Sequence, residues 1–120
     1  MIKTLNLADA FEAIQDCWKP TIAFELNGQE VRLAKLKGRF VWHRHEDADE
    51  LFYVVQGSLT IKLRDGDIVL KEGDLTVVPR GVEHCPEANE EAWVLLFEPT
   101  GTLNTGNVRC ERTIEELERL

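Results

Sequence analysis

The apolar and polar positions of this chain follow two different periods, and the first is helical. Leu7, Phe11 and Ile14 stand at i, i+4 and i+7, the spacing of a helix with one apolar face. Asn6 precedes them at a position where Asn is a favoured N-cap, and Asp9 lies where the helix dipole favours a negative charge. The pattern predicts one short amphipathic helix at the N-terminus.

From residue 21 the period changes to two, which is typical of β-strands. Asn27-Gly28 and Asp65-Gly66 are strong signals for two-residue hairpin turns. The predicted strands are 21–26, 30–36, 50–56, 58–64, 67–71, 75–79 and 92–97. Short antiparallel strands in this number must fold over on themselves to bury one face, so we expect an all-β sandwich or a small barrel.

The end of the chain has a different pattern. Thr113 and Glu116 form a capping box before an apolar stripe in residues 114–120, which predicts a short C-terminal helix. A helix of this length is too short to be stable alone, so it must pack against the body of the protein. The polar segment 100–107 has three interpretations: it covers a barrel mouth, reaches a neighbouring subunit, or is a surface loop.

Length and charge limit the classes of function. A chain of 120 residues corresponds to one domain, 1–120. Its net charge of −8 argues against nucleic-acid and anionic-membrane partners, although Arg32, Lys35 and Arg39 can form a local cationic patch. The N-terminus lacks an apolar signal stretch, and the three widely spaced cysteines fit reduced thiols, so we expect a cytoplasmic protein.

The three histidines are the candidates for chemistry. His43 and His45 are two residues apart in an extended segment, so both imidazoles leave the same face, although an H-x-H pair alone also occurs at surface or core positions. A hairpin return can bring Glu50 alongside them, and His84 follows the tight break at 79–81. Three neutral nitrogens and one anionic oxygen suit borderline divalent transition metals better than calcium or magnesium.

The spacing of these residues resembles the two motifs of the cupin superfamily. The first motif occupies 38–57 as Gly, four residues, His-Arg-His, four residues, Glu50, six residues and Gly. The second occupies 73–88 as Gly, five residues, Pro-Arg-Gly, two residues and His84. Two departures occur: the first gap is one residue short, and Ala88 stands where the family has Asn, which affects only the turn expected after His84.

The resemblance implies a double-stranded β-helix, the jelly-roll barrel of the cupins, here with a short helix at each end. It also implies a six-coordinate metal whose remaining positions are open to water or substrate. The implied metal ligands are His43, His45, Glu50 and His84. Glu50 is preferred to Asp49 because it alone is separated from Gly57 by six residues. Iron, manganese, nickel, zinc, cobalt and copper all accept such ligands.

Two functions are compatible with this resemblance. The first is a metal-dependent enzyme acting on a small oxygen-bearing molecule, an oxygenase or an isomerase, with Glu50 as metal ligand or catalytic proton acceptor. The second is a non-catalytic, metal-dependent binder of a sugar or small acid. Phe52 and Val54 share the face of Glu50, so they line the pocket or pack in the core. Cys85 follows His84 directly, so its side chain should point to the opposite face of the strand, and we expect it to be buried without a role in the site.

The resemblance also bears on the oligomeric state. Small cupins commonly pair through outer sheet faces or exchange terminal strands. A chain this short that exposes Trp18, Trp42 or Trp93 would be stabilised by covering them. We therefore expect a homodimer.

Overall fold

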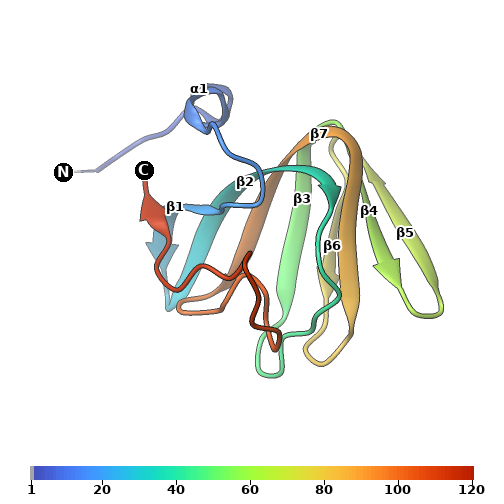
Figure 1. Cartoon of the computed structure of the whole chain (residues 1–120). Coiled ribbons are helices and arrows are strands. Elements are labelled where there is room, and N and C mark those ends of the chain that lie inside the picture. The colour runs from blue at the N-terminus through green and yellow to red at the C-terminus, as the bar shows by residue number, and fades with distance from the viewer. Residues whose placement is uncertain (1) are drawn as a thin grey trace.

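The chain folds into a jelly-roll β-barrel with one short helix among the residues described (Figure 1). The computed structural model describes residues 2–120. The elements are α1 (Leu7–Ala13), β1 (Thr21–Leu26), β2 (Gln29–Arg39), β3 (Glu50–Gln56), β4 (Ser58–Leu63), β5 (Gly66–Lys71), β6 (Leu75–Val78), β7 (His84–Pro99) and β8 (Glu118–Arg119). The predicted all-β class and barrel are confirmed, and the first six strands agree with the predicted ones to within three residues at each end.

The long strand β7 holds the barrel together. Its residues pair with β2 along most of its length, with β4 near its start and with β3 near its end. Figure 1 shows β7 bending sharply between these two regions. The strand runs without interruption from His84 through Ala88, so no turn follows His84. The strand order is β5-β4-β7-β2-β1-β8, and β3 also pairs with β6.

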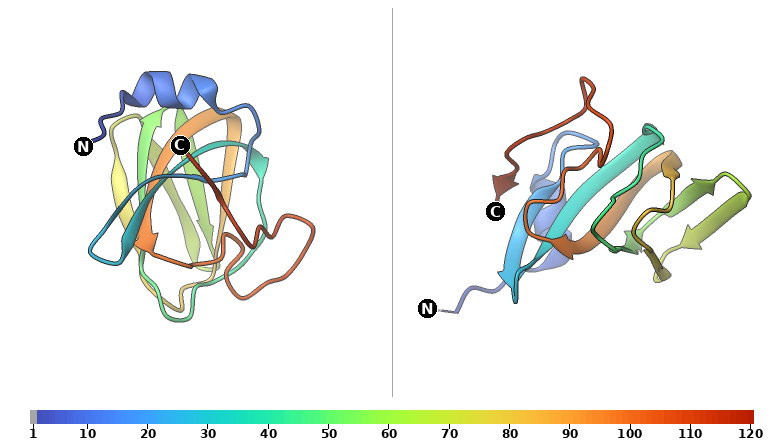
Figure 2. Two further views of the ribbon diagram at one scale, coloured as in Figure 1. Left: turned by 90° about the vertical axis from the view of Figure 1, so that its left-hand side faces the viewer. Right: turned by 90° about the horizontal axis from the view of Figure 1, so that it is seen from below.

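The predicted N-terminal helix is confirmed as α1, which lies across one end of the barrel (Figure 2). The side chain of Asn6 accepts a hydrogen bond from the backbone N–H of Asp9, as an N-cap should. Phe11 is fully buried and stacks on Trp93 with 5.1 Å between ring centroids. This contact joins the helix to β7. Residues 2–120 contain no helix with the length and apolar character needed to cross a membrane.

The predicted C-terminal helix is wrong. Residues 113–117 are irregular with a bend at 115–116, and β8 follows as a short strand parallel to β1. The Thr113 hydroxyl accepts from the backbone N–H of Cys110 and bonds to the Thr105 hydroxyl, and the N–H of Ile114 donates to Asn104. Because these groups already have partners in the loop, the capping box is not formed, and pairing with an open sheet edge replaces a marginal helix.

The polar segment 100–107 folds back onto its own barrel. Asn107 exchanges two hydrogen bonds with the backbone of Arg44: its N–H donates to the carbonyl at 3.0 Å, and its side-chain oxygen accepts from the N–H at 2.8 Å. Gly106 approaches this backbone so closely that a Cβ there would lie 2.2 Å from the Arg44 oxygen. The segment therefore lies against the loop that carries the two neighbouring histidines.

The three tryptophans are partly buried, and each contacts a side chain of its own chain. Trp18 stacks on Phe40 at 4.7 Å, and Trp93 stacks on α1. The guanidinium of Arg64 lies 3.7 Å from the ring centroid of Trp42. Each ring is half-buried by a partner in its own chain.

Candidate metal centre

Four buried side chains converge inside the barrel from three parts of the chain. His43 and His45 come from the segment between β2 and β3, Glu50 begins β3, and His84 begins β7. The backbones of His43 and His84 exchange hydrogen bonds of 3.0 and 2.8 Å, and the N–H of Gly81 donates to the carbonyl of His45. These bonds tie the two motif segments together, so residues 41 positions apart in sequence face one point.

The ligand atoms of the four side chains lie within 4.8 Å of one another. Glu50 Oε1 is 3.2 Å from His45 Nε2 and 3.4 Å from His84 Nε2. These three atoms are buried and have no hydrogen-bond partner that meets normal geometry among residues 2–120. Buried polar atoms without partners are costly, and a cation at their centre would satisfy all three. The cluster can therefore bind a metal ion.

Two of the imidazoles are held in orientation by backbone carbonyls. Nδ1 of His43 lies 2.9 Å from the oxygen of Val41, and Nδ1 of His84 lies 2.9 Å from the oxygen of Val82. A proton on each Nδ1 satisfies these contacts and leaves each Nε2 with a free lone pair. Outer hydrogen bonds of this kind are typical of metal-ligating histidines.

The electrostatic environment favours the ligand forms of His43 and Glu50. Burial, with a smaller contribution from the neighbouring His84, lowers the pKa of His43 to about 4. Burial alone would raise the pKa of Glu50, but the imidazoles of His45 and His84, at 3.2 and 3.4 Å from its Oε1, favour the ionised carboxylate and hold that pKa well below its usual range. A neutral imidazole and an ionised carboxylate are the forms that bind a metal.

The structure adds a buried ionic group that sequence reasoning did not identify. Arg32 donates from Nε and Nη2 to Glu30 Oε1 at 2.9 and 2.7 Å, and from Nη1 to the carbonyl of Thr102. Its Nη1 also lies 3.5 Å from Glu98 Oε2. The expected surface patch of Arg32, Lys35 and Arg39 is therefore wrong, because Arg32 points into the barrel and is 2% exposed.

Glu98 links this ionic group to the histidine cluster. It is 1% exposed, and it lines the same cavity as Glu50. Burial, followed by the charge of Glu50, raises the pKa of Glu98 well above its usual value. The alternation of residues along the strand could have identified Glu98, since it lies on the same inward face of β7 as the buried Val94 and Leu96.

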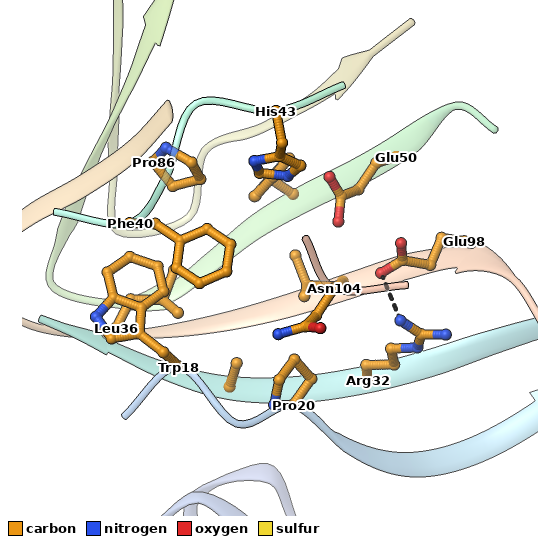
Figure 3. Close-up of a pocket in the computed structure, with 13 residues that line it drawn as sticks. Trp18, Pro20, Arg32, Leu36, Phe40, His43, Glu50, Pro86, Glu98 and Asn104 are labelled. Atoms are coloured by element: carbon orange, nitrogen blue, oxygen red, sulfur yellow. Dashed lines mark ion pairs between the residues drawn. The ribbon is translucent and has the colours of Figure 1, made fainter. Parts of the chain in front are cut away.

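A cavity of about 40 Å³ separates the cluster from Arg32 (Figure 3). Phe52 lines it, as do His43 and Glu50. Val54 does not line the cavity. It lies two residues farther along β3, where it pairs with Val94 and packs in the core.

The other two side chains considered from the sequence lie outside the cluster. Cys85 is fully buried, as expected. It follows His84 directly in the strand, so its side chain lies on the opposite face, and it does not belong to the group of possible ligands. Asp49 is exposed and accepts a hydrogen bond from the backbone N–H of Arg80. Of the two adjacent acids, only Glu50 therefore faces the histidines.

Comparison with known proteins gives a consistent family match. Residues 29–97, more than half of the chain, match the family described as Cupin domain. The crystal structure of a cupin-2 domain containing protein from Shewanella frigidimarina is 42% identical with a TM-score of 0.78. That alignment covers 79% of this chain and 93% of the other.

Two curated relatives match over shorter regions. YdbB of Bacillus subtilis is 44% identical over 61 residues, which make up 50% of this chain and 54% of YdbB. A 3-hydroxyanthranilate 3,4-dioxygenase of Ruegeria pomeroyi is 34% identical over 61 residues, covering 46% of this chain and 34% of the enzyme. The chain thus matches about half the length of the first relative and a third of the second.

Proposed function

The chain belongs to the cupin family, and we propose that it binds one divalent transition metal ion and acts on a small oxygen-bearing molecule. The proposed ligands are His43, His45, Glu50 and His84. One observation carries this proposal: two imidazole nitrogens and a carboxylate oxygen meet inside the barrel, buried and without other partners. The side chain of His43 completes a set of four within 4.8 Å.

The residues of the site have distinct tasks in this proposal. A divalent transition metal bound there would supply Lewis acidity and positions for oxygen ligands. His43 and His84 are held in place by the carbonyls of Val41 and Val82. Glu50 serves as ligand or proton acceptor. The sequence has no histidine beyond the three in the cluster, so proton transfer uses Glu50, another carboxyl group or water.

Among metal-dependent reactions we favour an oxygenase over an isomerase. The relative from Ruegeria pomeroyi is named as a dioxygenase, and its 34% identity extends over 61 residues of this chain. Iron or manganese is the metal that such a reaction favours. The second candidate function is a non-catalytic small-molecule binder, in which the cavity beside the cluster would hold the ligand.

Elemental analysis of the protein purified from its native host tests the proposed metal site. We expect about one equivalent of a transition metal in the natural protein and none in His45→Ala. Arg44→Ala is the matched control, because Arg44 lies between the two histidines and its side chain pairs with Glu46 at the surface. Equal metal content in the natural protein and His45→Ala would refute the proposal.

Measurements of turnover separate the two candidate functions. Iron or manganese together with oxygen uptake on a panel of small hydroxylated molecules would establish an oxygenase. Zinc without turnover would establish the binder. The same panel, monitored for product without oxygen consumption, tests the isomerase.

We also propose that the protein is a cytoplasmic homodimer. The side chains of Leu75 and Val77 on β6 are 59% and 49% exposed, and Val69 on β5 is exposed as well. Covering such side chains in a subunit interface is favourable. The three cysteines are free thiols, which fits a reducing compartment.

A further inference from the structure

Arg112, in the C-terminal segment, lies beside the apolar wall of the cavity. Its guanidinium carbon is 5.6 Å from the ring centroid of Trp18 and 5.6 Å from that of Phe40. The two rings stack on each other, and both line the cavity next to the histidine cluster (Figure 3). Phe40 also contacts the ring of His43 edge to face, with 5.5 Å between centroids. One aromatic ring therefore connects this cation to the cluster.

One nitrogen of this guanidinium has no partner. Nη1 of Arg112 is buried, and no atom in the part of the chain that the structure describes forms a hydrogen bond with it. The ion pairs among residues 2–120 do not include Arg112 either. Aromatic rings attract a cation, but an N–H group shielded from water also needs an acceptor. An anion from outside the chain can supply that acceptor.

The backbone that carries Arg112 is anchored beside the cavity. Asn104, which lines the cavity, donates from Nδ2 to the carbonyl of Arg112 at 2.8 Å. Its Oδ1 accepts from the N–H of Ile114 at 2.9 Å, so one side chain holds the backbone on both sides of residue 113. The hydroxyls of Thr105 and Thr113 also bond to each other. An anchored residue with an unused donor is preorganised for a ligand.

The other arginine at this cavity does not have a donor to spare. Arg32 lines the cavity, but Glu30 accepts from two of its nitrogens and the carbonyl of Thr102 accepts from the third. Glu98 also lies 3.5 Å from its Nη1. Arg32 therefore pairs with acids of its own barrel, whereas Arg112 has no acid of its own.

We propose that Arg112 binds the carboxylate of the ligand, which is a small monocarboxylic acid with a second oxygen for the metal. The apolar part of this molecule contacts Trp18 and Phe40, and its hydroxyl or carbonyl oxygen reaches the cluster. One guanidinium balances one negative charge, and a planar carboxylate matches its donor geometry. The cavity of about 40 Å³ limits the chain between the two groups to a few carbon atoms. This inference rests on the proposed metal site.

The test compares two probes of nearly equal size on the zinc-loaded protein, 3-hydroxypropionate and 3-hydroxypropionamide. Both have a hydroxyl group, and only the first is charged. The indole N–H signal of Trp18 in NMR spectra reports binding, since this ring lines the cavity and its N–H donates to the carbonyl of Lys37. We expect the acid to bind to the natural protein at least about tenfold more tightly than the amide at pH 7.

Arg112→Gln isolates the contribution of the guanidinium. It removes the positive charge, so the preference for the acid over the amide should fall at least about tenfold. A general loss of packing would weaken the binding of both probes and leave their ratio unchanged. Arg109→Gln is the matched control, because Arg109 is an exposed arginine of the same segment that pairs with Glu115, and it should keep the natural preference. A preference in Arg112→Gln within about twofold of the natural value would overturn the proposal.

The outcomes also separate this inference from the proposed function. Protein that takes up no zinc refutes the metal site and the inference together. Zinc-loaded protein whose preference for the acid does not depend on Arg112 refutes only the inference. If Arg112→Gln fails to fold, the natural protein still decides: amide binding as tight as that of the acid would contradict the proposed carboxylate site.

Discussion

Nη1 of Arg32 lies 3.5 Å from Oε2 of Glu98, and both side chains are almost completely buried. Glu30 and Glu98 stand directly opposite each other on β2 and β7. Arg32 contacts both acids and is the cation that lies between them. The barrel interior therefore depends on one arginine.

Removing this arginine should be severely destabilising. Arg32→Met leaves Glu30 and Glu98 buried without their cation, at an expected cost of about 3–5 kcal/mol in the free energy of unfolding. Urea denaturation measures the change. Arg119→Met is the control, since its ion pair with Glu25 is exposed and screened by solvent. Similar losses in the two variants would contradict the role given to Arg32.

Acid should destabilise the metal-free protein through His43. Its pKa is about 4 in the folded state and near 6.5 in the unfolded chain. Between these two pH values His43 is protonated in the unfolded chain but not in the folded protein. The free energy of unfolding therefore decreases as the pH falls from 6.5 to 4. The expected contribution is roughly 3 kcal/mol.

Urea denaturation of the metal-free protein at pH 7.5, 5.5 and 4.5 measures this effect. His43→Gln removes the titrating group, so its stability should fall less over the same range. The difference between the two proteins isolates His43 from other acid-sensitive groups. Identical pH dependence would show that His43 titrates normally in the folded state.

Gly106 should tolerate no side chain. It has a φ of +56°, and a Cβ there would lie 2.2 Å from the backbone oxygen of Arg44. Gly106→Ala must displace the segment that covers the histidine loop. Gly101→Ala is the control, because Gly101 also has a positive φ of +87° but has open space around it.

Thermal and urea unfolding of the two variants separate strain from steric contact. Gly101→Ala should cost about 1–2 kcal/mol from backbone strain alone. Gly106→Ala should exceed that loss by at least ~1 kcal/mol. Equal losses would mean that the segment moves away freely.

The exposed apolar side chains of β6 should mediate dimerisation. Analytical ultracentrifugation at micromolar concentration is expected to show a dimer, and Val77→Glu should shift it to a monomer. Glu72→Lys, outside any strand, should leave the dimer intact. A natural protein that sediments as a monomer would refute the proposed assembly.

Local sequence signals predicted most of the fold but not its ends. The Asn6 cap, the hairpin dipeptides and the period-two alternation act over a few residues, so they are readable without the tertiary structure. Thr113 shows the limit of such signals. Its hydroxyl bonds across the loop to Thr105, a contact that no local pattern contains, and the expected helix gives way to pairing with β1.

The same distinction applies to the candidate site. Spacing indicated the histidines and Glu50, because their separations follow a family pattern. Arg32 and Glu98 belong to no such pattern, and charged residues in strands usually face solvent. Their inward orientation follows from the register between β2 and β7, which brings Glu30 opposite Glu98 and makes a buried cation favourable.

A crystal structure of the cobalt-loaded protein, with anomalous scattering from the metal, tests the central claim most directly. We predict one strong anomalous peak among His43, His45, Glu50 and His84, at about 2.0–2.2 Å from the Nε2 atoms and from Glu50 Oε1. Cobalt bound elsewhere, with these four side chains still packed against one another, would contradict the account.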